Sequence, residues 1–373
     1  MPKRPVFEEV SADTPSARAT PAAGERREAR GAIAAWLWTL AGLVAVMVLV
    51  GGLTRLTDSG LSITVWDPVM GVIPPLSDAD WQAAFAAYKE TTEFQKQNHW
   101  MTLADFKPIY WWEWGHRFFG RLIGVVWIVG LVTFLALRAV PRGWTWRLVL
   151  PGLLGGVQGA VGWWMVVSGL DKLDVASYRL ATHLGLAFVI FMLLVWTALK
   201  IRLEPVALLA ARRARAHWAG AMSGVMVAAV FAQLLVGALV AGIDAGRSFV
   251  DWPLMQGQWF PPNAFSLDPA WRNFFENAGL VQFTHRVLGY AVLLLAVVYA
   301  LVAARPGLTA LKRRGRWVLY AVFAQVVTGI VTVMHAAPLE LAILHQAGAL
   351  LVIWLLMRAR FAALYPAQQR ITA

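Results

Sequence analysis

The chain is 373 residues long, with 59% hydrophobic residues and only 14% charged residues. Soluble globular proteins average about one quarter charged residues, so this composition excludes an ordinary soluble domain and indicates an integral membrane protein. The absence of cysteine excludes disulfides, thiolate metal sites and cysteine nucleophiles. The formal net charge is +12, and on a soluble protein such an excess would suggest a nucleic-acid partner.

The first part of the chain, residues 1–30, is rich in Ala, Pro, Arg and Glu and shows no apolar periodicity. It is predicted to be a disordered tail, and it lacks the apolar core and cleavage site of a secretory signal peptide. Eight apolar segments follow, each long enough to cross about 30 Å of hydrocarbon. The spans are expected at 33–53, 116–138, 147–168, 180–200, 217–242, 280–303, 317–335 and 339–358.

The connections between these spans alternate in charge along the chain, because Lys and Arg are concentrated in every second one. By the positive-inside rule, both termini then face the cytoplasm and the long connections 54–115 and 243–279 face outward. Tryptophans cluster in the outer segments, where an aromatic belt is expected. Most of the +12 charge is therefore a topology signal, and no nucleic-acid partner is expected.

The first outer connection carries a helical pattern of its own. Ser77 followed by Asp80 resembles a capping box. Three aromatic residues then recur at helical spacing: Trp81, Phe85 and Tyr88. The pattern predicts a helix over about 77–98 on the outer face, either an amphipathic helix that lies on the membrane or a solvated surface helix.

The two halves of the chain repeat each other in sequence. The segment GGLTRLTDSGLSITVWDP at 51–68 aligns with GALVAGIDAGRSFVDWP at 237–253, and the order of later matches is kept. Four spans per half is an even number, so the repeats have the same orientation and are related by an axis along the membrane normal. The predicted fold is an all-α integral membrane protein with eight transmembrane helices in two tandem four-helix bundles, 31–203 and 204–373, related by a pseudo-two-fold axis.

Four of the seven histidines form a matched set with two members in each half. They lie a few residues inside the outer ends of the even-numbered spans: His116, His183, His285 and His345. Two imidazoles on facing helices of a bundle are a common way to hold haem iron from both sides. Zinc or copper fits poorly, since each half offers two histidines and no cysteine. The four histidines are therefore predicted to be axial ligands of haem iron.

Glycines and arginines close to these histidines also repeat between the halves. Gly120 and Gly289 each lie four residues after a histidine on the same helical face. There they either leave room for a flat macrocycle or serve as helix–helix contacts. Arg117 and Arg286 directly follow a histidine, and their guanidinium groups could meet haem propionates or lipid headgroups.

The halves differ in one position that bears on chemistry. Glu113 lies three residues before His116, whereas Gln282 lies three residues before His285. A carboxyl group at membrane depth is costly and usually functional, so Glu113 is predicted to be the catalytic acid–base group. This places chemistry in the first half and electron storage or transfer in the second. The structural alternative is an ion pair between Glu113 and Arg117.

Three segments together resemble the haem A synthase family: DSGLSITVWDPVMGVIPP, FKPIYWWEWGHRFFGRLIG and VAGIDAGRSFVDWPLMQG. The resemblance covers about 33–360 and is closest to the cysteine-free branch of alphaproteobacteria and mitochondria. Some bacterial relatives carry an outer-loop cysteine pair, which this chain lacks. The resemblance implies an oxidoreductase that converts the C8 methyl group of haem O to a formyl group, by stepwise hydroxylation and dehydration. The product, haem A, would serve cytochrome c oxidase.

The resemblance also implies roles for the two histidine pairs. His116 and His183 would ligate the substrate haem, and His285 and His345 would ligate a haem b cofactor. Glu113 would take part in the oxidation. The implied setting is the bacterial cytoplasmic membrane, with the haem sites near the periplasmic side. Implied partners are haem O, the lipid bilayer, a haem O synthase and an electron-transfer partner, and a homo-oligomer is a further possibility.

Two other functions compete with this interpretation. A diheme b-type electron carrier without substrate chemistry would explain the four histidines, but not the difference between Glu113 and Gln282. A transporter built from parallel repeats could use histidines in a proton path. The sequence lacks the Gly/Pro-broken helix at mid-span that such a transporter would favour.

Overall fold

The computed structural model describes residues 23–67, 70–170, 175–213, 215–305 and 309–366. Within these ranges every long element is an α-helix and there is no β-strand. Among the described residues, eight helices are long and apolar enough to cross a membrane, which confirms the predicted number of spans. A helix pairs its own backbone N–H and C=O groups, as it must in the hydrocarbon core of a membrane, where there is no water to bind them.

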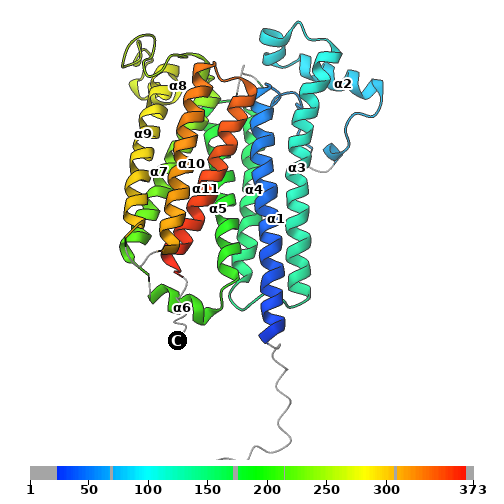
Figure 1. Ribbon diagram of the computed structural model, residues 1–373. Coiled ribbons are helices and arrows are strands. Elements are labelled where there is room, and N and C mark those ends of the chain that lie inside the picture. Colours follow the sequence, from blue (N-terminus) through cyan, green and yellow to red (C-terminus); the bar gives the residue numbers. More distant parts are fainter. Residues whose placement is uncertain (1–22, 68–69, 171–174, 214, 306–308, 367–373) are drawn as a thin grey trace, which may run out of the picture.

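The eight long helices form two groups of four, which succeed each other along the chain (Figure 1). The first group is α1 (Ala23–Leu56), α3 (Leu103–Ala136), α4 (Thr145–Val167) and α5 (Ser177–Ile201). The second group is α7 (His217–Gly242), α9 (Ala278–Ala303), α10 (Thr309–Met334) and α11 (Leu339–Leu364). Connecting segments contain α2 (Asp78–Lys89), α6 (Pro205–Arg213), α8 (Asn273–Glu276), and the short turns η1 (Met70–Val72), η2 (Phe94–Asn98), η3 (Ala245–Arg247) and η4 (Ala270–Arg272).

Helices that follow each other within a group are neighbours in space. In the first group α1 contacts α3, α3 contacts α4, α4 contacts α5, and α5 returns to α1. In the second group α7, α9, α10 and α11 close a ring in the same order. The groups meet where α5 packs on α7 and α11, and where α1 packs on α11. Helices α3 and α5 therefore lie on one diagonal of the first bundle, and α9 and α11 on the equivalent diagonal of the second.

The connections sort to the two ends of the bundle as a membrane topology requires. Figure 1 shows α2 and α8 at one end, and α6 at the other. The beginning of α1 and the end of α11 lie at the same end as α6. His183 and His345 lie within two turns of the starts of α5 and α11, which are at the end that carries α2 and α8.

The predicted disordered tail is wrong for its last residues. Helix α1 begins at Ala23, so residues 23–30 are helical, whereas residues 1–22 lie outside the described part of the chain. Arg30 is buried, and its guanidinium donates to the carbonyl oxygen of Ile201 at 3.0 Å. It also pairs with Glu204 at 3.4 Å. The helix extends below the apolar segment because Arg30 satisfies the otherwise unpaired C-terminal carbonyl of α5.

The predicted outer helix is shorter than expected and is covered differently. The capping box forms, since the Ser77 hydroxyl accepts from Asp80 N at 3.1 Å and the Asp80 carboxylate accepts from Ser77 N at 3.0 Å. These hydrogen bonds hold the pKa of Asp80 below its usual value. The α-helix ends at Lys89 instead of near residue 98, and the π-helical turn η2 follows.

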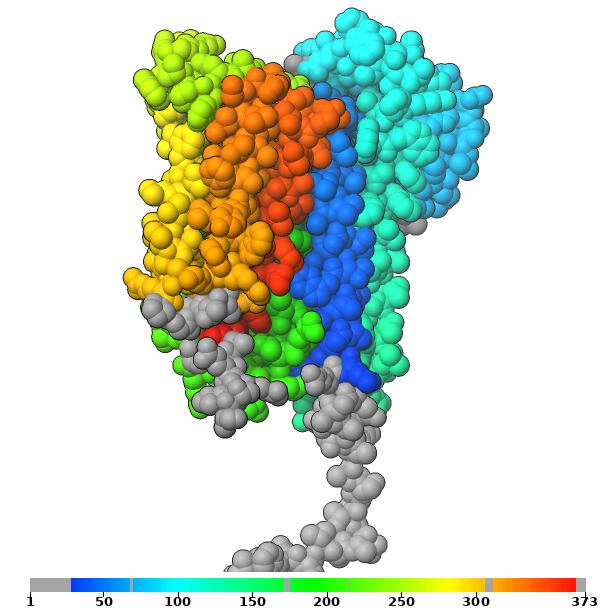
Figure 2. All heavy atoms as spheres, in the orientation of Figure 1, coloured from blue at the N-terminus to red at the C-terminus, as the bar shows by residue number. Residues whose placement is uncertain are grey.

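The apolar face of α2 packs against protein, and neither the membrane nor solvent covers it. Its buried aromatic residues form one cluster with residues of α3: Trp81, Phe85, Tyr88, Phe106, Ile109 and Tyr110. Helix α3 begins at Leu103 instead of the predicted residue 116, because this cluster supports an extra aromatic segment above the span. Figure 2 shows the cyan lobe that results, projecting beyond the bundle. Burial also raises the pKa of the Tyr88 hydroxyl.

Candidate haem-binding sites

The structure brings the four predicted histidines together in two pairs, one in each bundle. The ring centroids of His116 and His183 lie 6.5 Å apart, and those of His285 and His345 lie 6.4 Å apart. A metal–imidazole bond is about 2.0–2.1 Å, so two imidazoles on one ion have nitrogens about 4 Å apart and ring centroids about 6 Å apart. Both pairs therefore have the spacing of two ligands that face one metal ion.

The two histidines of each pair lie on helices that face each other across the bundle and are not neighbours in the ring. His116 is on α3 and His183 on α5, while His285 is on α9 and His345 on α11. No cluster of three or more His, Cys, Asp or Glu ligands occurs among the described residues. Two protein ligands on opposite sides suit haem iron, because the porphyrin supplies the remaining nitrogen ligands.

The two other helices of each bundle present a glycine to each histidine ring. A Cβ atom added at each of these positions would lie as close to the histidine ring as non-bonded atoms can approach, or closer. The distances are 3.2 Å for Gly51–His116, 3.1 Å for Gly162–His183, 2.9 Å for Gly237–His285 and 2.9 Å for Gly329–His345. The internal repeat pairs Gly51 with Gly237 and Gly162 with Gly329. Only the structure shows that these glycines face the histidines. Sequence reasoning missed this role.

Two of the imidazoles also carry an unexplained buried nitrogen. Among the described residues, Nδ1 of His183 and Nδ1 of His285 are buried without a hydrogen-bond partner. Side-chain amides hold the backbone of the same residues, since Gln158 donates to the His183 carbonyl and Gln233 to the His285 carbonyl, each at 3.0 Å. Unpartnered buried nitrogens are rare in proteins. Paired imidazoles on facing helices, each with a glycine against its ring, are a donor set that fits haem.

The predicted glycines Gly120 and Gly289 face a side chain of the first helix in their own bundle. A Cβ at Gly120 would lie 3.4 Å from Met47 Cε, and one at Gly289 would lie 3.2 Å from Gln233 Nε2. Met47 and Gln233 are equivalent in the repeat. The structure therefore favours the helix-contact alternative for these glycines, and room for a macrocycle beside them stays a prediction.

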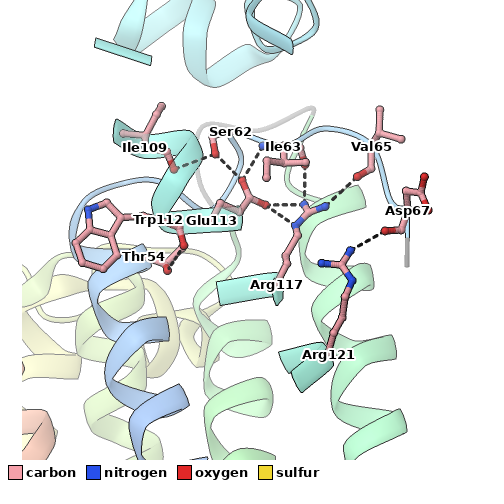
Figure 3. Close-up of polar contacts among 10 residues, drawn as sticks. All are labelled: Thr54, Ser62, Ile63, Val65, Asp67, Ile109, Trp112, Glu113, Arg117 and Arg121. Atoms are coloured by element: carbon pink, nitrogen blue, oxygen red, sulfur yellow. Dashed lines mark hydrogen bonds and ion pairs between the residues drawn. The ribbon is translucent and has the colours of Figure 1, made fainter. Parts of the chain in front are cut away.

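Glu113 is buried, with 2% of its surface exposed, and forms the ion pair that the structural alternative describes. Its Oε1 accepts from Arg117 Nη2 at 2.5 Å and from Arg117 Nε at 3.1 Å. Its Oε2 accepts from the Ser62 hydroxyl and from Ile63 N, both at 2.7 Å (Figure 3). Arg117 donates onward to the carbonyl oxygens of Ile63 at 2.6 Å and Val65 at 2.9 Å. Glu113 and Arg117 thus clamp the loop after α1 onto α3.

The second bundle repeats this clamp with a neutral amide. Gln282 donates from Nε2 to the carbonyl oxygens of Ala245 at 2.9 Å and Phe249 at 3.1 Å. Arg286 donates to the Phe249 carbonyl at 2.9 Å and to Gln282 Oε1 at 3.2 Å. The loop therefore offers acceptors to Gln282, whereas the equivalent loop in the first half offers donors to Glu113. Both arginines bind loop carbonyls, and their contact with propionates stays a prediction.

One arginine links the two bundles at the end where the histidines lie. Arg55, on the last turn of α1, pairs with Asp58 in its own half at 2.7 Å and with Asp244 in the other half at 2.7 Å. Both aspartates have left-handed backbone conformations, with φ of 48° and 50°. Aspartate tolerates this region better than most residues. The repeat predicts the equivalence of the aspartates, but not the bridge between them.

Comparison with known proteins shows which family the sequence belongs to. The profile of a family described as "Cytochrome oxidase assembly protein" matches residues 34–357. The chain is 56% identical over 375 residues to the "Heme A synthase" of Ruegeria pomeroyi, covering 98% of this chain and 97% of the relative. It belongs to the haem A synthase family.

Other relatives are similar over the same length. The chain is 54% identical over 374 residues to the "Heme A synthase" of a Ruegeria species, with 98% of each chain covered. It is 50% identical over 372 residues to that of Paracoccus denitrificans, with 98% of this chain and 97% of the relative covered. The family match includes both bundles and all four paired histidines. It confirms the resemblance drawn from the three sequence segments.

Proposed function

We propose that the protein is a haem A synthase of a bacterial cytoplasmic membrane. It would oxidise the C8 methyl group of haem O to a formyl group and so supply haem A for cytochrome c oxidase. The observation that carries this proposal is the identity of 56% to a heme A synthase over nearly the whole chain. The two diagonal histidine pairs, 6.5 and 6.4 Å between centroids, support it because each can hold a haem.

The division of labour between the bundles follows from their asymmetry. The first bundle carries a buried carboxylate one helical turn from His116, so we assign to it the substrate haem, held by His116 and His183. The second bundle has the neutral Gln282 at the equivalent place, and we assign to it a haem b held by His285 and His345. When bound, haem b supplies reversible one-electron transfer.

The proposed role of Glu113 is to accept protons released as the substrate methyl group is oxidised. Every hydrogen bond described for its two oxygens comes from a donor: Arg117, Ser62 or Ile63 N. That arrangement suits a carboxylate, which can take a proton when the substrate provides one. Burial excludes bulk water as a competing acceptor, and the contacts with Arg117 and the loop after α1 keep the side chain in one place. Positioned acid–base groups contribute about 10²–10⁴-fold to rate.

We assign the end that carries α2 and α8 to the periplasmic side and the end that carries α6 to the cytoplasm. Helix α6 ends in Arg212 and Arg213, and the nearby ends of the spans are also basic. The positive-inside rule places such a segment in the cytoplasm. Both termini would then be cytoplasmic, and the two haem sites would lie at similar depth near the periplasmic face.

The haem content of the purified protein tests this function. The protein is produced in cells that make haem O, and its haems are extracted, separated by chromatography and identified by mass. We expect haem b together with haem O, an oxidised intermediate or haem A. Haem b alone would contradict the synthase and support a diheme electron carrier.

A matched pair of variants tests the role of Glu113. Glu113→Gln keeps the size of the side chain, so the low-spin haem spectrum should persist while haem A falls by about 10²–10⁴-fold. Glu340 is a second acid at the outer end of a span, and it is exposed, so Glu340→Gln should leave haem A production unchanged. Normal haem A production by Glu113→Gln would show that Glu113 serves only as a clamp.

A further inference from the structure

His345 differs from the other haem-site histidines in what surrounds its Nδ1 atom. The hydroxyl oxygen of Thr328, on α10, lies 3.3 Å from His345 Nδ1. The same hydroxyl donates to the carbonyl oxygen of Gln325 at 3.0 Å. The side-chain amide of Gln325 lies 3.1 Å from His345 Nδ1 and donates to the His345 carbonyl at 2.6 Å. Two residues one turn apart on α10 therefore meet one imidazole edge.

One of these two contacts suits the tautomer that a haem ligand needs. Ligation through Nε2 leaves the proton on Nδ1, which must then donate. The amide nitrogen of Gln325 cannot accept this proton, and it donates one of its two hydrogens to the His345 carbonyl. The Thr328 hydroxyl donates its single hydrogen to the Gln325 carbonyl. The lone pairs of the hydroxyl oxygen can therefore accept a hydrogen bond from Nδ1–H. When His345 ligates through Nε2, Thr328 is therefore the one of these two side chains that can accept from Nδ1–H.

The first bundle lacks this acceptor at the equivalent position. The repeat pairs Gln158 with Gln325 and Gly162 with Gly329, so Val161 takes the place of Thr328. Valine has almost the same shape as threonine but no polar atom. In agreement, His183 Nδ1 is buried without a hydrogen-bond partner among the described residues. The same holds for His285, so the hydroxyl contact distinguishes one ligand within the second bundle as well.

We propose that Thr328 is a positioning residue that tunes the haem bound in the second bundle. By accepting the Nδ1 proton it fixes the orientation of His345 and makes the imidazole a stronger donor to iron. Hydrogen bonds to the outer nitrogen of a ligand raise its basicity. A stronger donor stabilises ferric iron more than ferrous iron, so it lowers the reduction potential. With this hydrogen bond from His345, the haem of the second bundle is a stronger reductant than the haem of the first bundle, where Val161 takes the place of Thr328.

This inference rests on the proposed assignment of haem to the second bundle. The experiment uses the purified, haem-loaded protein and titrates it with a reductant while the absorption spectrum is recorded. His345→Ala identifies which reduction step belongs to the second bundle, because that step should disappear. If the haem content and both steps survive His345→Ala, then the proposed haem assignment fails independently of Thr328.

The decisive variants at this position are isosteric or conservative. Thr328→Val should keep haem b bound, move the midpoint potential of the second step in the positive direction, and change the low-spin ferric electron paramagnetic resonance signal. Thr328→Ser retains the hydroxyl and should restore both properties. An unchanged potential and signal in Thr328→Val, or an equal shift in Thr328→Ser, would overturn the proposal, since either result leaves only a packing role.

A reciprocal variant keeps the proposal testable if Thr328→Val loses haem. Val161→Thr introduces the hydroxyl beside His183 at the equivalent position of the first bundle. We expect the midpoint potential of the first-bundle haem to move in the negative direction, with the second step unchanged. No shift in a Val161→Thr protein that binds haem in both bundles would contradict the argument.

Discussion

Gly51→Ala tests whether glycine against the histidine ring is required for haem binding. Gly51 lies on α1, and an added Cβ would be 3.2 Å from His116 Nε2 and 3.5 Å from His116 Cδ2. Gly42 lies on the same helix in an exposed position, and an added Cβ there would have no atom within 4 Å. Gly42→Ala is therefore the matched control for the same change in the same helix.

The expected magnitudes follow from these contacts. Alanine is favoured over glycine inside a helix by about 1 kcal/mol, so Gly42→Ala should raise the free energy of unfolding by up to this amount. Gly51→Ala has the same helical gain but also overpacks its neighbour, which costs about 1–3 kcal/mol. Relative to the control, it should be less stable by about 1–3 kcal/mol.

The larger effect is expected on haem binding. At 3.2 Å the His116 ring must move by a few tenths of an ångström to admit the methyl group. Metal–ligand distances tolerate changes of only about 0.2 Å, so the ring cannot move this far and still ligate well. Haem in the first bundle should be lost or lose its low-spin spectrum.

The assay is haem content per polypeptide together with the absorption spectrum of the purified proteins. Gly237→Ala, whose Cβ would lie 2.9 Å from His285, should remove the haem of the second bundle in the same way. Full haem content with an unchanged spectrum in Gly51→Ala would refute the reasoning. A loss of haem in Gly42→Ala equal to that in Gly51→Ala would refute it as well.

Two further predictions concern the outer end of the bundles. Arg55→Leu removes the bridge between Asp58 and Asp244, and because both carboxylates are half exposed the loss should be about 1 kcal/mol. Unfolding by detergent titration should depend on salt in the wild type but less in the variant, and an equal salt dependence would contradict the bridge. Backbone N–H groups of the following turn lower the pKa of Asp251, so this carboxylate closes a loop over the buried Met255. Asp251→Ala should speed maleimide labelling of Met255→Cys, which is the single thiol of that chain. With Asp251 intact, the introduced thiol should be protected from labelling at every pH above the lowered pKa of Asp251. This protection should be lost only as the pH falls through that pKa.

Much of the architecture could be predicted because membrane spans are set by local composition. An apolar segment in a membrane must pair its backbone N–H and C=O groups within itself. Each such segment therefore predicts a helix without knowledge of its neighbours. Boundaries depended on neighbours and were predicted less well. Helix α3 begins at Leu103 because α2 packs on its aromatic extension, and α1 begins at Ala23 because Arg30 binds the end of α5. Neither contact has a signal in local hydropathy.

The candidate site divides in the same way. Depth in the membrane and the internal repeat were enough to select His116, His183, His285 and His345 among seven histidines. Their pairing across the bundle diagonals is a distance between helices, which no local pattern contains. For Glu113 the sequence left two roles open, since Arg117 lies one turn away on the same helix. The structure adds the donors of the loop after α1 and shows that the ion pair forms.

The sequence by itself thus determined the number of spans and the duplication, and it selected the candidate ligand residues, because all three follow from local apolarity and residue type. Tertiary structure alone decided what each of these histidines touches. Gly51 and Gly329 come against histidine rings, and Thr328 comes against one Nδ1, only because separate helices pack side by side. Arg55 reaches Asp244 across 189 positions of sequence for the same reason. Side-chain contacts between helices depend on packing geometry, and periodicity within one helix does not specify it.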